Sequence, residues 1–183
     1  LNQDVRALFN HDPNFVFVND PLGPATGTLL MDNTVRAHSN AAFLKDSYSN
    51  YLKLVALGND KADYTVIHFM EDATPQFDGQ YDAYKFFAYD ESYPQLYSIT
   101  DKNVAINALP ETEIVQLGFL AGIDGEYEIQ SVEINDIPEV WLEDTFTGTL
   151  TDLSSDSYSF NYTTGDDPGR FILHFAPMSV EDN

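Results

Sequence analysis

Short stretches in which every second residue is apolar dominate this sequence, and they constrain its fold more than any other feature. Successive side chains of a β-strand point to opposite faces, so this period of two predicts strands with one buried face. It is clearest in four stretches: 64–69, 115–121, 156–163 and 170–175. In the first stretch, Thr65, Ile67 and Phe69 alternate with Tyr64, Val66 and His68. In the others, one face is shared by Val115, Leu117 and Phe119, then by Tyr158, Phe160 and Tyr162, and finally by Phe171, Leu173 and Phe175. We therefore expect an all-β protein.

Turn-forming residues separate these stretches at intervals of about ten residues, a spacing typical of β-sandwiches. Asp78-Gly79 and Asp124-Gly125 favour short turns. The segment GDDPG (165–169) lies between two alternating stretches and predicts a hairpin that joins the last two strands. Together these features predict an antiparallel two-sheet β-sandwich of the jelly-roll or immunoglobulin-like kind.

One alternating stretch, GEYEIQSVEI (125–134), changes phase in its middle. Tyr127 and Ile129 share one parity, whereas Val132 and Ile134 share the other. An extra residue in one strand of a pair, a β-bulge, shifts the side chains that follow it to the opposite face. We therefore predict a bulge or bend near Gln130–Ser131 that keeps all four apolar side chains inward.

The chain has 183 residues, of which 43% are hydrophobic, including 13 Phe and 11 Tyr. This suits one domain with a sizeable core. We assign residues 26–176 to the β-sandwich domain, residues 1–25 to an N-terminal extension or the edge of a preceding module, and residues 177–183 to the start of a C-terminal linker. The internal pattern does not settle whether residues 1–25 belong to the sandwich.

The charge of the chain is strongly negative, with 8 Lys and Arg against 30 Asp and Glu, a formal net charge of −22. Such a surface repels nucleic-acid phosphates and anionic membranes, so we expect neither as a partner. No apolar run reaches the about 18 residues of a membrane span, and the sequence predicts no transmembrane segment. Cysteine is absent, which excludes disulfides and thiolate chemistry.

Catalytic motifs are not found in the sequence. The four histidines form no HExxH motif, and neither a nucleophile elbow nor a P-loop occurs. With 30 acidic residues, pairs of carboxylates arise by chance, so their spacing does not indicate a catalytic pair. We predict that the protein is not an enzyme.

The segment FDGQYDAYKF (77–86) has two interpretations. Carboxylates in a loop that contains Gly are typical calcium ligands, which makes Asp78, Asp82 and the more distant Asp144 candidates for a Ca²⁺ site. No other cofactor is indicated. Alternatively, Asp82 is a structural anchor that binds loop N–H groups or pairs with Lys85, three residues later. We favour the anchor.

Aromatic side chains offer a third kind of site. Trp141 is the only tryptophan and shares a strand face with Glu143, which predicts that it faces outward. Tyr81 and Tyr84 belong to a cluster of tyrosines in the first half of the chain. Exposed rings beside polar groups could stack against sugars, so these three residues are candidate ligand-binding positions. Ordinary sandwich packing is the alternative, and we favour it.

Several stretches occur in an order that is similar to a known family: 27–46, 51–69, 77–86, 96–110, 122–129, 140–162 and 170–175. The most specific are Asp-Ala-x-Lys (82–85) and the series Leu-Glu-Asp, Tyr-x-Phe and Arg-Phe within 142–171. Together they resemble the β-sandwich module that precedes the C-terminal sorting domain in cargo of the type IX secretion system of Bacteroidota. In that family a sorting domain normally follows. We therefore expect either that a sorting domain lies beyond residue 183 or that it has been cleaved off.

This resemblance implies a non-catalytic structural or adhesive module in an extracellular or cell-surface bacterial protein. Its partners would be other domains of the same polypeptide, and glycans or neighbouring surface proteins. Seven residues match recurrent polar positions of that family: Arg36, Asp78, Asp82, Lys85, Glu143, Asp144 and Arg170. The resemblance suggests that such residues hold loops to strands, and besides the three aspartates, which are also calcium candidates, this assigns Arg36, Lys85, Glu143 and Arg170 as structural anchors. Two alternative functions are a carbohydrate-binding module of a secreted polysaccharide-degrading enzyme and a self-assembling subunit of a surface filament.

Overall fold

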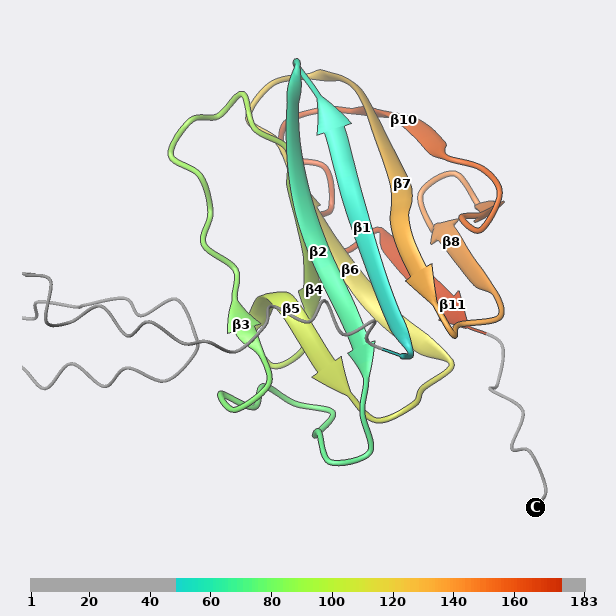
Figure 1. Ribbon diagram of the computed structural model, residues 1–183. Helices are drawn as coiled ribbons and strands as arrows, with labels where there is room; N and C mark the ends of the chain where they lie inside the picture. Colours follow the sequence, from blue (N-terminus) through green and yellow to red (C-terminus); the bar gives the residue numbers. More distant parts are fainter. Residues whose placement is uncertain (1–48, 176–183) are drawn as a thin grey trace, which may run out of the picture. The chain divides into compact units, whose positions relative to one another are not determined.

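A computed structural model describes residues 49–175 (Figure 1). The strands are β1 (Tyr51–Gly58), β2 (Lys61–Phe69), β3 (Ala83–Tyr84), β4 (Gln95–Ile99), β5 (Asn103–Leu109), β6 (Ile114–Leu120), β7 (Gly125–Asn135), β8 (Val140–Asp144), β9 (Thr149–Asp152), β10 (Tyr158–Tyr162) and β11 (Phe171–Phe175). This part of the chain contains no helix, so the all-β prediction is confirmed. Residues 49–175 accordingly offer no helix that is long and apolar enough to cross a membrane.

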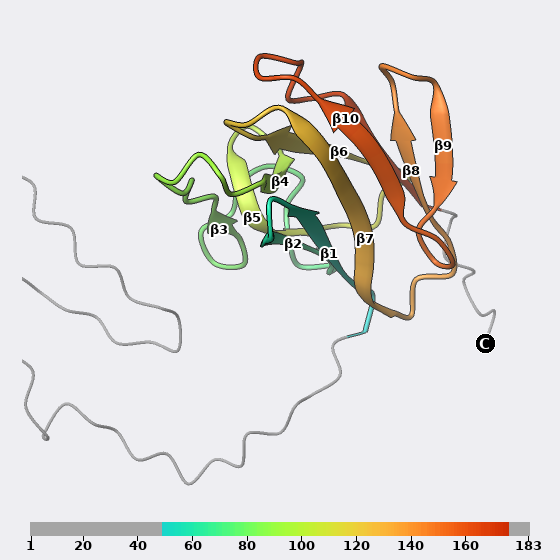
Figure 2. The same cartoon turned by 90° about the horizontal axis from the view of Figure 1, so that it is seen from above.

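The strands form one mixed sheet in the order β10-β7-β1-β2-β5-β4-β6-β11-β8-β9, with β3 also paired to β5. The sheet curls around its core and nearly closes on itself (Figures 1 and 2). Pairing is antiparallel except between β2 and β5, which are parallel. The prediction of purely antiparallel pairing is wrong at this point. Residues 70–102 separate the two strands, a connection long enough for the chain to return and run in the same direction.

Aromatic rings fill the centre of the molecule. Phe119 of β6 lies 5.2 Å from Tyr127, 5.0 Å from Phe160 and 5.2 Å from Tyr162, measured between ring centroids. Tyr127 belongs to β7 and the other two belong to β10, and neither strand is next to β6 in the sheet. Two halves of the curled sheet therefore face each other across one core. In the first alternating stretch the buried set is Thr65, Ile67 and Phe69. Of the nine side chains that share a face in the other three stretches, all are buried except Tyr158, which is partly buried.

The predicted bulge in β7 is present, close to the expected place. Leu54 of β1 pairs with Ser131 and Lys53 pairs with Glu133, so Val132 is the extra residue. Ile134 packs against the core. Val132, however, is 52% exposed, and the prediction that it faces inward is wrong. The reason is geometric, because the extra residue of a bulge has no partner and turns away from the buried face.

The segment 165–169 joins β10 to β11, but it does not form the predicted hairpin. β10 pairs with β7, whereas β11 pairs with β6 and β8. The segment thus carries the chain from one half of the sheet to the other. Turn residues such as Gly165, whose φ is +99°, mark where the chain changes direction, but they do not determine which strands become neighbours. The predicted boundaries at residues 25 and 176 lie outside the described residues.

Candidate functional site

The segment 77–86 lies between β2 and β5, and Asp82 holds it in place. Its Oδ2 atom accepts a hydrogen bond of 2.7 Å from the N–H of Asp78, which closes the turn. Its Oδ1 atom accepts one of 2.7 Å from the N–H of Ala108 in β5. Burial raises the pKa of Asp82, against the opposing effect of these two N–H groups. These contacts are those of a structural anchor, since both oxygens bind backbone donors.

Lys85 connects the same segment to two further strands. Its ammonium group pairs with Asp63 of β2, rather than with Asp82 as the sequence suggested. The Oδ2 atom of Asp63 also accepts a hydrogen bond of 2.6 Å from the N–H of Leu96 in β4. The Lys85 side chain is only 4% exposed. Sequence reasoning missed Asp63, because no local pattern relates it to a lysine that follows 22 residues later.

A second polar cluster, formed by Asp144 and Arg170, lies inside the protein. The Nε of Arg170 donates to Oδ1 of Asp144 over 3.0 Å, and Nη2 donates to Oδ2 over 2.5 Å. The side chain of Asp144 is 0% exposed and that of Arg170 is 3% exposed. Oδ1 also accepts the N–H of Phe146 over 3.0 Å, and Oδ2 accepts the hydroxyl of Tyr158 over 2.7 Å. Each carboxylate oxygen of Asp144 therefore already accepts two hydrogen bonds.

The guanidinium carbon of Arg170 lies 4.9 to 5.1 Å from the centroids of three aromatic rings, those of Phe146, Phe160 and Phe171. Such rings attract a cation through their electron-rich faces. Burial by itself would raise the pKa of Asp144. The hydrogen bonds from Arg170, Tyr158 and Phe146, with the positive charge of Arg170, outweigh it and lower the pKa. The pair is therefore held as two ions.

The three predicted calcium ligands do not form one site. Asp78 and Asp82 precede β3, whereas Asp144 ends β8. Oδ1 of Asp78 accepts the N–H of Gln80 over 2.9 Å. Among residues 49–175, no three His, Asp or Glu side chains come together in a way that could hold a metal ion. Calcium binding remains a prediction.

The three aromatic candidates also lie apart. Tyr84 is half exposed and stacks on Phe77, with ring centroids 4.1 Å apart and planes 20° apart. Tyr81 lines a hollow over β2 and β5, together with His68 and Ile106. Trp141 lines a different hollow, on the outer face of β8 and its neighbours. The structure therefore supports separate surfaces and not one combined aromatic site.

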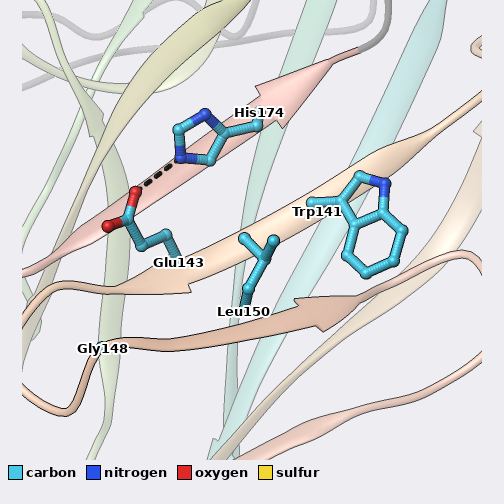
Figure 3. Close-up of a pocket in the computed structure, with 5 residues that line it drawn as sticks. All are labelled: Trp141, Glu143, Gly148, Leu150 and His174. Carbon is cyan, nitrogen blue, oxygen red and sulfur yellow. Dashed lines mark hydrogen bonds and ion pairs between the residues drawn. The ribbon is translucent and has the colours of Figure 1, made fainter.

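The hollow beside Trp141, of about 430 Å³, is lined by Trp141, Glu143, Gly148, Leu150 and His174 (Figure 3). In β8 the alternate residues are buried, which turns Trp141 and Glu143 outward as predicted. His174 of β11 is opposite Trp141, and Leu150 of β9 is opposite Glu143. Nε2 of His174 lies 2.7 Å from Oε2 of Glu143. His174 alternates with the buried Leu173 and Phe175 and so lies on the outer face, but only strand pairing shows that it meets Trp141.

Of the four residues assigned as structural anchors from the resemblance, three lie in the described part. Lys85 and Arg170 are buried and paired as described above, and Glu143 is half-buried on the outer face. Arg36 lies outside the described residues.

Comparison with known proteins assigns the chain to a family. The chain belongs to the family described as "Domain of unknown function (DUF8693)". The family model matches residues 13–175. No curated protein and no solved structure matches the chain. Membership of this family names no activity, substrate or partner.

Proposed function

We propose that this chain is a non-catalytic structural module of an extracellular or cell-surface bacterial protein that is exported by the type IX secretion system. The single observation that carries the proposal is that the distinctive polar residues of the chain form contacts within the fold. Asp82, Lys85 and Arg170 each connect a loop to strands or one strand to another. Contacts between loops and strands stabilise a fold, and this is the property that a structural module requires.

The chemistry of the two polar clusters supports a non-catalytic role. A general acid or base must reach a substrate proton with a lone pair or proton that is not already engaged. Both oxygens of Asp82 and both oxygens of Asp144 accept hydrogen bonds from the protein itself. These carboxylates are therefore poorly placed to act on a ligand.

The resemblance described above supplies the location, and the charge is compatible with it. A net charge of −22 limits non-specific association with anionic surfaces and with other copies of the chain. We assign the module a position beside other domains of the same polypeptide, as a spacer and folding unit. The finer fold assignment, a jelly-roll or immunoglobulin-like two-sheet sandwich, is part of this proposal, and the two facing halves of the sheet favour it.

Export of a reporter tests the proposal. The chain would be inserted between a fluorescent reporter and a type IX sorting domain in a Bacteroidota host that has this secretion system. A Gly/Ser linker of equal length replaces the chain in the control. We expect the folded chain to raise the amount of intact reporter at the cell surface, measured by protease accessibility and immunoblotting. We expect Asp82→Ala, which leaves two backbone N–H groups without their acceptor, to lose much of this gain.

Equal surface amounts for the chain and the linker would overturn the structural role. Hydrolytic activity of the purified chain on a panel of polysaccharides, lost in a single acid-to-amide variant, would replace the proposal with an enzyme. A gain that persists in Asp82→Ala, when that variant has a lower melting temperature, would show that stability of the fold is not what matters.

A further inference from the structure

We propose that the outer face around Trp141 binds an uncharged oligosaccharide. This goes beyond a structural role, because it assigns a binding site and a ligand class to one surface of the module. It does not depend on how the protein is exported, so either proposal can fail without the other.

The strand register defines this face, which we call the Trp141 face. Four strands lie side by side there in the order β6, β11, β8 and β9. Their outward residues form two rows, Gln116–Ile172–Glu143–Leu150 and Ile114–His174–Trp141–Asp152. Since neighbouring strands are about 4.8 Å apart, each row spans roughly 15 Å. The face is therefore long enough for a short sugar chain and is hollowed beside the indole.

Four of the eight side chains of the face are apolar, and they are accessible. Ile114 and Leu150 are more than half exposed, and Trp141 and Ile172 are half-buried. A pyranose ring presents a flat patch of C–H groups on its faces and hydroxyl groups around its edge. An indole beside aliphatic side chains offers a surface for the C–H patch to cover. Ligand sites commonly combine such an apolar lining with a few polar groups that fix orientation.

Glu143 and His174 supply those polar groups. A carboxylate only accepts hydrogen bonds, so Nε2 of His174 is the donor in the 2.7 Å contact with Oε2 of Glu143. This contact holds the two side chains together in the hollow that Trp141 and Leu150 also line (Figure 3). Oε1 of Glu143 accepts hydrogen bonds, and Nδ1 of His174 is a second polar atom, an acceptor in the neutral imidazole and a donor in the charged one. Sugar hydroxyl groups both donate and accept, so these two atoms, which lie in the same hollow as Trp141, can orient a sugar in either case.

The charge of the molecule selects the class of sugar. Glu143 and Asp152 are both part of the face, and the whole chain carries a net charge of −22. Sulfated or uronic-acid glycans would be repelled by this field. An uncharged glucan, xylan or mannan pays no such penalty. The ligand class is therefore a neutral polysaccharide or a fragment of one.

The composition provides a direct readout. Trp141 is the only tryptophan, so tryptophan emission reports the Trp141 face alone. The purified chain would be titrated with hexasaccharides of cellulose, laminarin, xylan and mannan, with an alginate oligosaccharide as the anionic probe. Retardation in gels that contain the matching polymers gives a second measurement. We expect saturable emission changes and retardation with at least one neutral sugar, and none with alginate.

Variants locate the site. We expect Trp141→Ala to weaken retardation about ten-fold or more, as truncation of a central aromatic contact usually does. Glu143→Gln, which keeps the side-chain shape, should weaken it by a smaller factor. Tyr84→Ala is the matched control, because it removes an exposed aromatic ring from another part of the surface and should leave binding unchanged. Circular dichroism and melting temperatures would verify that each variant is folded.

Three results would overturn the proposal. The first is neither an emission change nor retardation with any neutral sugar of the panel. The second is binding that Trp141→Ala and Glu143→Gln leave intact, which would place the sugar elsewhere. The third is preference for alginate. If Trp141→Ala does not fold, Glu143→Gln and Leu150→Ala take its place. Sugar binding that both of these variants leave intact would overturn the proposal.

Discussion

Asp144 and Arg170 are two opposite charges in the interior, where removal from water costs several kcal/mol for each ion. The carboxylate of Asp144 offsets this cost by accepting four hydrogen bonds, two of them from Arg170. Arg170 is planar and forms a fork that matches a carboxylate, which lysine could not reproduce. The contact joins β8 to the start of β11 and so stabilises the same strands that carry the Trp141 face.

Breaking this pair from one side should be costly. We expect Asp144→Asn to lower the free energy of unfolding by about 3 kcal/mol, because it leaves Arg170 buried with only the carboxylate of Asp166, 3.4 Å away, as a charged partner. Denaturant unfolding at neutral pH measures this. The double variant Asp144→Leu with Arg170→Met removes both charges and should be less destabilised than Asp144→Asn alone. If the double variant is the less stable one, the cost of unpaired charge is not the cause.

The pH dependence of this contribution follows from its sign. The pKa of Asp144 is lower in the folded protein than the ordinary value of about 3.9 in the unfolded chain. Its contribution is therefore complete above that ordinary value and is lost as the pH falls through the lowered pKa. We expect the stability difference between the wild type and Asp144→Asn to be constant near neutral pH and to shrink below about pH 4. A gap that is independent of pH down to acid unfolding would contradict this.

At the scale of one element, β7 shows how a strand corrects its own register. Tyr127 and Ile129 face the core before the bulge, and Ile134 faces it after the bulge. The extra residue, Val132, changes the parity between them. Without it, Ser131 and Glu133 would become neighbours, and the pairing with Leu54 and Lys53 would continue without interruption.

Deletion of Val132 should therefore be tolerated, because the inward residues stay inward. Deletion of Asn161 in β10 is the matched control, since that strand has no bulge to absorb the loss. It moves Phe160 or Tyr162 to the wrong face. We expect the second deletion to cost about 3 kcal/mol or more, similar to the loss of a buried aromatic side chain, and the first to cost clearly less. Thermal unfolding followed by circular dichroism compares them. Equal losses would argue against the register explanation.

At the scale of the whole molecule, the net charge of −22 is a source of self-repulsion. Salt screens interactions between exposed charges over a Debye length, which falls from about 30 Å at 0.01 M to about 3 Å at 1 M. We expect the melting temperature to rise by several degrees as NaCl is increased over this range. A melting temperature that falls with salt would mean that attractive ion pairs outweigh the repulsion.

Calcium is tested in the same experiment. Because both oxygens of Asp82 already bind backbone N–H groups, we expect Ca²⁺ and Mg²⁺ to raise the melting temperature equally at matched ionic strength. An additional rise that is specific to Ca²⁺ and is lost in Asp82→Ala would restore the calcium interpretation of residues 77–86, since a ligand that binds only the native state stabilises it.

Much of the secondary structure could be predicted from residue order. Alternation identified strands and the side chains that share a face, and the phase change in 125–134 located the bulge to within two residues. Alternation also predicted that Trp141 and Glu143 face outward, as they do in β8. These properties are local, because the two-residue period of a strand is set by backbone geometry within a few residues.

The pairing of strands could not be predicted in this way. The parallel contact of β2 with β5, the separation of β10 from β11, and the pairing of Lys85 with Asp63 all join residues that are far apart along the chain. Turn residues and periodicity contain no information about such neighbours. The Trp141 face has the same origin, since His174 meets Trp141 only because β11 lies beside β8. Side chains were thus assigned to a face by the local pattern, whereas their partners were assigned by packing of the whole sheet around one core.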